Sequence, residues 1–133
     1  MLDTNMVSYI LTGRSGAARG ALEGLGANDV ACVSAITEAE LRYGLVKSVN
    51  ATKRRPALEW FLARMQVLAW GSEEAQVYGI LRAKQEAAGK MLESMDLLIA
   101  AHAISAGAIL VSRDKVFARV DDLSAVVNWA TDL

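Results

Sequence analysis

Short strand-like runs alternate with longer helical segments along all 133 residues of this chain. The runs "DVACVSA", "QVLAW", "AILVS" and "AVVNW" are mainly apolar, and a two-residue stub, "ML", precedes the first helical segment. Strands that are buried on both faces read as continuous apolar runs, which is typical of a parallel sheet covered by helices. No linker or repeat divides the chain, and its length suits one domain. The sequence therefore predicts a single α/β domain over residues 1–133.

The helical segments are delimited by capping residues and glycines. Ser34 and Ser72 are expected to be N-caps, and Gly89 is expected to end the helix that follows Ser72. A polar turn, "NATKR", is expected to join two helices into a hairpin, with Pro56 in the first turn of the second. The predicted helices cover Thr4 to Leu11, part of "GRSGAARGALEGLG", Ser34 to about Val49, Pro56 to Met65, Ser72 to Gly89, and "MDLLIAAHAISAG".

Composition and charge argue against several broad classes of protein. No apolar run approaches the roughly 18 residues of a membrane span, so we expect a soluble protein without a membrane partner. No basic and apolar leader opens the chain, and the single cysteine, Cys32, cannot form an internal disulfide. These features favour the cytoplasm. The formal net charge of −1 argues against a generally basic nucleic-acid surface but leaves room for local basic patches.

Three acidic residues are expected at one edge of the predicted sheet. Asp3 follows the "ML" stub, Asp114 follows "AILVS" by two residues, and Asp96 opens the helix that precedes that strand. Ligands of open parallel sheets bind beyond the carboxyl ends of the strands, so these carboxylates are candidates for a common site. Carboxylate oxygens suit hard cations such as Mg²⁺, and the chain has no histidine and cysteine cluster for zinc.

A fourth acid is expected from the segment "SAITEAELRYG". Glu38 and Glu40 are two residues apart and therefore about 200° apart around a helix, so only one of them can face the site. Glu38 precedes Arg42 by four residues, the favourable order for an exposed ion pair, whereas Glu40 lies on the stripe of Ile36 and Gly44. We therefore choose Glu40.

Four segments in this order, "LDTN", "SAITEAELRYG", "MDLLIAAHA" and "ILVSRDKVF", resemble VapC-type PIN domains over essentially the whole chain. The resemblance implies a three-layer sandwich in which helices flank a central, mostly parallel sheet of four to five short strands. It implies a Mg²⁺-dependent endoribonuclease, with Mn²⁺ as the alternative ion. Carried over by position, it gives the metal and catalytic set Asp3, Glu40, Asp96 and Asp114, supported by Asn5 and Ser112. Glu93 adds a nearby carboxylate to which the resemblance assigns no role.

The same resemblance implies the partners. Members of this family are usually toxins whose cognate VapB-like antitoxin masks the acids with a basic side chain, and they commonly form homodimers. For an RNA substrate, the candidate contacts are Lys47, Arg113 and Lys115. For a homodimer, the predicted hairpin is expected to offer an apolar surface made of Leu41, Leu45, Leu58, Phe61 and Leu62.

Other interpretations of these residues remain open. A PIN-like fold without catalysis would serve as an RNA- or protein-binding module. A phosphatase of the haloacid-dehalogenase type also begins with an aspartate after its first strand, but it needs a second aspartate two residues later, where this chain has Asn5. His102 is a candidate base, although its offset from Asp96 on the helix favours packing. Single acids after strands also serve as ordinary helix caps.

Overall fold

Three segments that are far apart in the sequence lie side by side at the centre of the molecule. They are residues 1–2, β1 (Cys32–Ser34) and β3 (Leu110–Val111) in a computed structural model that describes residues 1–133. The backbone N–H of Leu2 donates to the carbonyl of Cys32 at 2.9 Å, and the N–H of Val111 donates to the carbonyl of Met1 at 2.7 Å. The N-terminal dipeptide therefore joins β1 to β3, and a parallel bridge pairs Leu2 with Val111.

Two outer strands complete the sheet. β2 (Gln66–Leu68) pairs with β1 in parallel, with Cys32 opposite Gln66, and β4 (Val126–Val127) pairs with β3 in parallel, with Leu110 opposite Val126. The order across the sheet is β2, β1, residues 1–2, β3, β4. The prediction of a parallel sheet of four to five short strands is thus confirmed, and no strand is longer than three residues.

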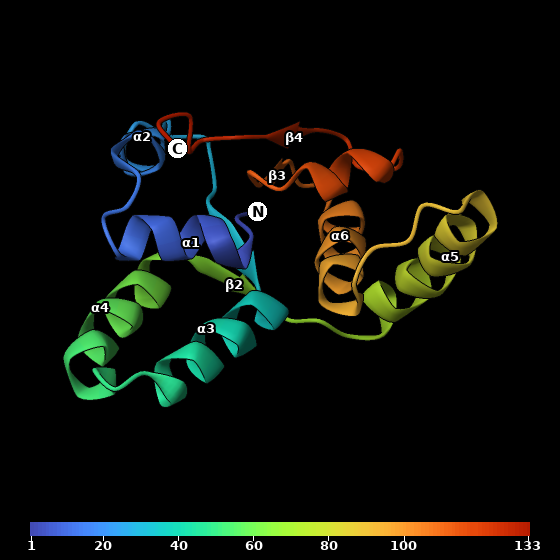
Figure 1. Cartoon of the computed structure of the whole chain (residues 1–133). Coiled ribbons are helices and arrows are strands. Elements are labelled where there is room, and N and C mark those ends of the chain that lie inside the picture. The colour runs from blue at the N-terminus through green and yellow to red at the C-terminus, as the bar shows by residue number, and fades with distance from the viewer.

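Helices cover both faces of this sheet, as Figure 1 shows. The first four helices gather on one side of the strands, and the last two lie on the other side with a short 3₁₀ helix. Their bounds are α1 (Thr4–Leu11), α2 (Gly16–Glu23), α3 (Ala35–Lys47), α4 (Ala51–Arg64), α5 (Ser72–Ala88), α6 (Ser94–Ala106) and η1 (Lys115–Arg119).

The strands contribute side chains to two separate apolar cores, because neighbouring residues of a strand point to opposite faces of the sheet. Cys32 and Leu110 belong to the core beneath α6 and η1, whereas Val33 and Val111 belong to the core beneath α1, α3 and α4. Burial on both faces is the reason why the strand sequences show no polar alternation. It also produces the three layers that the resemblance implies.

Two helix starts differ from the expectation. α4 begins at Ala51, so the predicted turn "NATKR" is largely helical and Pro56 lies inside the helix. Pro56 removes only one backbone donor, near the exposed N-terminal end of α4, and the helix continues past it. α5 begins at Ser72, but its N-cap is Gly71, whose N–H donates to Glu74 Oε2 at 2.8 Å. The ends of the helices at Gly89 and Gly107 have positive φ, as glycine caps do.

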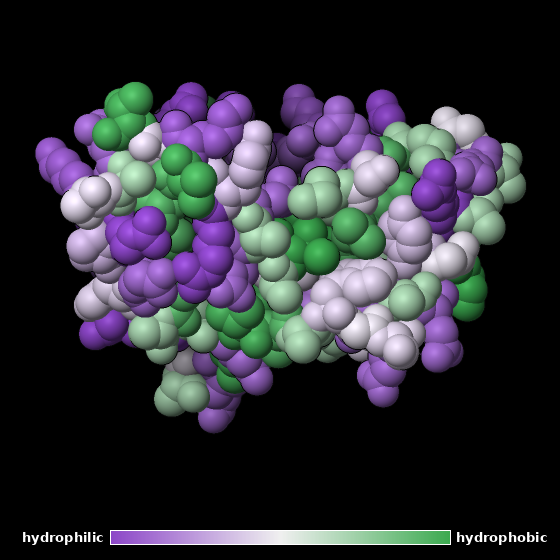
Figure 2. All heavy atoms as spheres, turned by 90° about the horizontal axis from the view of Figure 1, so that it is seen from below, coloured by the Kyte–Doolittle hydropathy of each residue, from purple (hydrophilic) through white to green (hydrophobic).

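The prediction of an exposed apolar surface on the α3–α4 hairpin is wrong. The side chains proposed for it are buried within the monomer, because α1 and the sheet cover the inner faces of both helices; they are Leu41, Leu45, Leu58, Phe61 and Leu62. The exposed hydrophobic residues of the hairpin are instead Tyr43, Val46, Val49 and Trp60. Figure 2 shows the molecule from below, where hydrophobic residues reach the surface among hydrophilic ones.

No helix in the structure has both the length and the apolar character needed to cross a membrane.

The central position of Leu2 gives a test of this architecture. Leu2 is only 1% exposed, so Leu2→Ala should lower the free energy of unfolding by about 2–5 kcal/mol, the usual effect of a cavity in a core. Ile109→Ala is the matched control, because Ile109 directly precedes β3, the strand next to Leu2, but is 51% exposed, and it should cost less than about 0.5 kcal/mol. Urea unfolding measures both values, and equal effects would contradict the central placement of Leu2.

Candidate active site

Asp3 is placed by the backbone that follows the central dipeptide. It is the N-cap of α1, and its Oδ1 accepts a hydrogen bond from the N–H of Met6 at 2.7 Å. Only 5% of Asp3 is exposed, and burial raises the pKa of its carboxyl group. A hydrogen bond from the Ser112 side chain acts in the opposite direction and favours the ionised form. Asp3 is therefore a buried acid with partners that hold it in one orientation.

Asp114 stands beside Asp3 because β3 is hydrogen-bonded to the N-terminal segment. The N–H of Asp3 donates to the carbonyl of Val111 at 3.0 Å, and Asp114 follows three residues later. Asp114 is the N-cap of η1 and accepts from the N–H of Val116 at 2.9 Å. Ser112 Oγ accepts from the N–H of Asp114 at 3.0 Å. The buried Ser112 thus connects the two aspartates, which is the supporting position expected for it.

Asp96 lies in the first turn of α6 and is half-buried. Its pKa is raised to about 6, first by burial and then by the negative charges of Asp114, Glu93, Glu40 and Asp3. The other predicted acids, and Glu93 with them, therefore lie close enough to Asp96 for their charges to act on its carboxyl group. Glu93 itself is exposed and immediately precedes α6.

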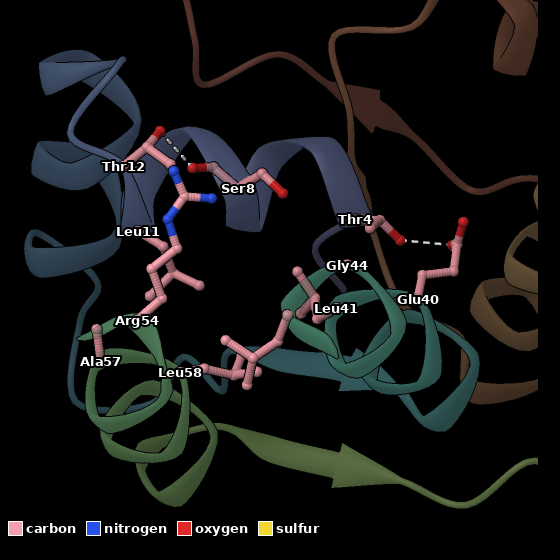
Figure 3. Close-up of a pocket in the computed structure, with 11 residues that line it drawn as sticks. Thr4, Ser8, Leu11, Thr12, Glu40, Leu41, Gly44, Arg54, Ala57 and Leu58 are labelled. Carbon is pink, nitrogen blue, oxygen red and sulfur yellow. Dashed lines mark hydrogen bonds between the residues drawn. The ribbon is translucent and has the colours of Figure 1, made fainter. Parts of the chain in front are cut away.

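The two glutamates of α3 point in different directions. Glu40 Oε1 accepts a hydrogen bond from the Thr4 hydroxyl at 2.6 Å, as Figure 3 shows. Glu38 Oε1 instead accepts from Arg42 Nε at 2.9 Å, four residues along the same helix. These are the directions that the spacing of the two residues indicates. Glu40 therefore belongs with the aspartates and Glu38 with the surface.

The four chosen acids line one small cavity of about 80 Å³ at the carboxyl edge of the sheet. Thr4, Asn5, Ile99 and Phe117 complete its walls. All the polar side chains in this lining offer oxygen atoms, and after burial the charges of the neighbouring acids also raise the pKa values of Asp3 and Asp96. The chemistry of this donor set fits a hard divalent cation.

The acids do not form a closed ligand shell. No group of three acidic, histidine or cysteine side chains is arranged to hold a metal ion directly. Mg²⁺ does not need such a shell, since it usually retains several waters and binds through one or two carboxylates. An open cluster of mutually repelling carboxylates is therefore compatible with a hydrated Mg²⁺ ion.

An apolar groove of about 450 Å³ adjoins the acidic cavity and runs between α1, α3 and α4 (Figure 3). Thr4 and Glu40 line both hollows, so the groove begins at the acids. Leu41 and Leu58 form part of its wall, and Arg54 from α4 brings a cationic side chain to it. The groove thus offers apolar surface between a carboxylate and a guanidinium group.

A third, polar cavity of about 590 Å³ lies on another side of the acids. Its lining residues are Asn5, Tyr9, Arg113, Asp114, Lys115, Asn128 and Leu133. Two of the candidate RNA contacts, Arg113 and Lys115, are therefore next to the acidic site. The third, Lys47, lines none of these cavities, and its Nζ lies 5.4 Å from the centroid of the Tyr43 ring.

Several residues at these cavities were not predicted. Thr4 has a sequence signal, since it directly follows Asp3, whereas Tyr9 is signalled only by its position one turn after Asn5. Asn128 reaches the site through the pairing of β4 with β3, which the sequence does not reveal. His102, by contrast, is buried and its Nδ1 lies 2.7 Å from Ser34 Oγ, away from the acidic cavity. This confirms the packing interpretation of His102.

Known proteins match this chain over nearly its full length. Ribonuclease VapC2 of Haemophilus influenzae is 40% identical over 134 residues, which cover 97% of this chain and 96% of that protein. Ribonuclease VapC2 of Rickettsia felis is 35% identical over 130 residues, with the same coverage. The crystal structure of VapBC2 from Rickettsia felis, bound to a DNA fragment from their promoter, contains a chain that superposes with a TM-score of 0.91. That chain is 34% identical, and the match covers 97% of each chain.

The family comparison agrees with these relatives. The family model for the PIN domain matches residues 1–123, a range that contains all four acids. The two relatives match this chain over more than nine-tenths of its length at 35% and 40% identity. The chain therefore belongs to the PIN-domain family and is a VapC-type member of it.

Proposed function

We propose that this protein is a Mg²⁺-dependent endoribonuclease that hydrolyses phosphodiester bonds of RNA, with Mn²⁺ as an alternative ion. The observation that carries the proposal is the meeting of four carboxylates, contributed by four separate segments of the chain, in one cavity at the carboxyl edge of the sheet. The relatives named as ribonucleases support the choice of RNA. Structural neighbours that are VapBC complexes support a role as the toxin of a toxin–antitoxin pair.

Asp3, Glu40, Asp96 and Asp114 would hold the metal, which would supply an acidified water and stabilise negative charge on phosphate oxygens. The other residues of the site orient these acids. Thr4 donates to Glu40, and Ser112 links Asp3 with Asp114. Such partners fix the direction of a ligand carboxylate and so preserve the geometry that the reaction needs. No side-chain nucleophile is required.

The proposed partners follow from the same charges. A VapB-like antitoxin would inhibit the enzyme by presenting a basic side chain to the acidic cavity, because a cation there would relieve the repulsion that, after burial, raises the pKa of Asp96. A homodimer in the cytoplasm is the proposed form of the protein. Its contact would use exposed hydrophobic residues, such as Tyr43 and Trp60 of the α3–α4 hairpin, in place of the buried leucines.

The catalytic set can be tested by amide substitutions. Asp3→Asn, Glu40→Gln and Asp96→Asn should each reduce RNA cleavage by at least about a hundredfold, since losing only a supporting partner of a ligand costs about 10- to 100-fold. Chelation with EDTA should abolish cleavage by the parent. The measurement is cleavage of single-stranded RNA by purified protein with millimolar Mg²⁺.

Glu38→Gln is the matched control for Glu40→Gln. Glu38 lies on the same helix but pairs with Arg42, so this variant should retain most of the activity. Full activity in EDTA would rule out the metal mechanism. An inactive Glu38→Gln protein beside an active Glu40→Gln protein would refute the assignment of the helix face.

Stability gives a second test, which needs no substrate. The pKa of Asp96 is raised from 3.8 to about 6 in the folded protein, so this carboxyl costs stability as the pH rises from about 4 to about 6. Asp96→Asn removes that cost. After allowance for the solvent screening of a half-exposed group, the variant should be about 1 kcal/mol more stable at pH 7 in EDTA and should melt a few degrees higher.

Calorimetry with and without Mg²⁺ completes this comparison. Millimolar Mg²⁺ should raise the melting temperature of the parent, because it binds only the folded arrangement, and should raise that of Asp96→Asn less. A structural carboxylate at a helix start would give the opposite sign in EDTA, with a loss of about 1 kcal/mol. That result, together with a parent that ignores Mg²⁺, would refute the metal site.

A further inference from the structure

The polar cavity of about 590 Å³ has no role in the chemistry described above, although it adjoins the acids. Asn5 and Asp114 line both this cavity and the acidic one. A strand of RNA whose phosphate lies at the acids can therefore continue directly into the polar cavity. Its volume lies within the range of about 300–1,000 Å³ that is usual for small-ligand sites.

The cavity contains cationic side chains that are free to bind an anion. Arg113 and Lys115 flank Asp114, are exposed, and take part in no ion pair. Some other basic residues of the chain are engaged in ion pairs; Lys84, for example, lies 2.8 Å from Asp122. Most contacts that position a protein on nucleic acid are made by such cations to phosphate oxygens. The two side chains thus provide phosphate contacts next to the acids.

The cavity also contains an aromatic ring and an amide with free donors. Tyr9 lies one turn after Asn5 on α1, and the Arg14 guanidinium lies 5.2 Å from the centroid of its ring. The side-chain oxygen of Asn128 accepts from the N–H of Ala130 at 2.9 Å, which leaves its NH₂ group without a protein partner. Proteins hold single-stranded RNA by stacking bases on aromatic rings and by hydrogen-bonding the exposed base edges.

We propose that this cavity binds one nucleotide of the substrate, adjacent to the scissile phosphodiester. The base stacks on Tyr9 and receives a hydrogen bond from the Asn128 amide, while Arg113 and Lys115 contact its phosphate. The inference rests on the proposed ribonuclease function and adds to it the position at which the base is recognised.

The test is binding of a fluorescently labelled single-stranded RNA of about 12 nucleotides, which suits a single-strand site, measured by anisotropy in EDTA so that no cleavage occurs. Tyr9→Leu should weaken binding by about tenfold, since it removes one base–aromatic stack. Tyr9→Phe keeps the ring and should bind as the parent does. Equal affinities of Tyr9→Leu and the parent would overturn the stacking contact.

A single abasic nucleotide, moved along the RNA, locates the contact. At one position the missing base should make the parent and Tyr9→Leu bind equally, and at all other positions the tenfold difference should persist. A difference that persists at every position contradicts a single stacked base. A similar loss of heparin affinity in Tyr9→Leu would also contradict it, because heparin has charge but no bases.

The phosphate contacts are tested with variants of two exposed residues, one before η1 and one at its start, which should not disturb folding. Arg113→Gln and Lys115→Gln should each weaken RNA binding and reduce the slope of log affinity against log salt by about 0.7, the value for one phosphate contact on a single strand. Lys53→Gln is the matched control, because Lys53 is exposed on α4 and outside the cavity, and it should leave the slope unchanged. Unchanged slopes in both Arg113→Gln and Lys115→Gln would overturn the phosphate contacts.

The two proposals fail in different ways. A parent that shows this binding pattern in EDTA but does not cleave RNA with Mg²⁺ contradicts the proposed function and leaves the nucleotide site intact. A parent that cleaves RNA, with variants that bind as the parent does, contradicts only the nucleotide site.

Discussion

The pairing of residues 1–2 with both β1 and β3 is the contact on which the rest of the molecule depends. These two residues hold together two short pairs of strands that otherwise share no backbone ladder. They also supply both cores, because Met1 faces the core beneath α6 and Leu2 faces the core beneath α1. The register of this pairing places Asp3 beside the end of β3. The architecture and the acidic cavity therefore depend on the same few backbone hydrogen bonds.

Asp3 and Asp114, the two aspartates next to Ser112, also act as helix N-caps. Asp3 caps α1 and Asp114 caps η1, so the hydrogen bonds that start these two elements also fix the direction of the carboxylates. Such bonds favour the ionised form, whereas burial and neighbouring charges favour the neutral one. Asp96 accepts no cap bond, and burial together with the neighbouring charges raises its pKa to about 6. The same residues thus combine local stabilisation with an electrostatic strain that a cation would relieve.

The sequence predicts the parts of this structure that depend on local pattern. Helical spacing and the Arg42 partner are enough to turn Glu40 and Glu38 in different directions, and apolar runs identify the four strands. Pro56 was misleading, because a proline tolerated inside α4 resembles one that starts a helix. The sequence does not reveal that the leucines of the hairpin are buried, because their burial depends on α1, a segment distant in sequence. Asn128 was missed for the same reason, since only the β3–β4 pairing brings it to the acids.

The central position of the N-terminus has a consequence for synthesis on the ribosome. The backbone nitrogen of Met1 bonds to the carbonyl of Ile109, a contact that spans 108 positions of the chain. Contacts of such long range form late and slow the folding of a domain. A nascent chain therefore exposes Asp3, Glu40 and Asp96 well before Asp114 and β3 have emerged to gather them. The acidic cavity can assemble only after β3 and Asp114 have been synthesised, so a nascent chain that lacks them has no such cavity.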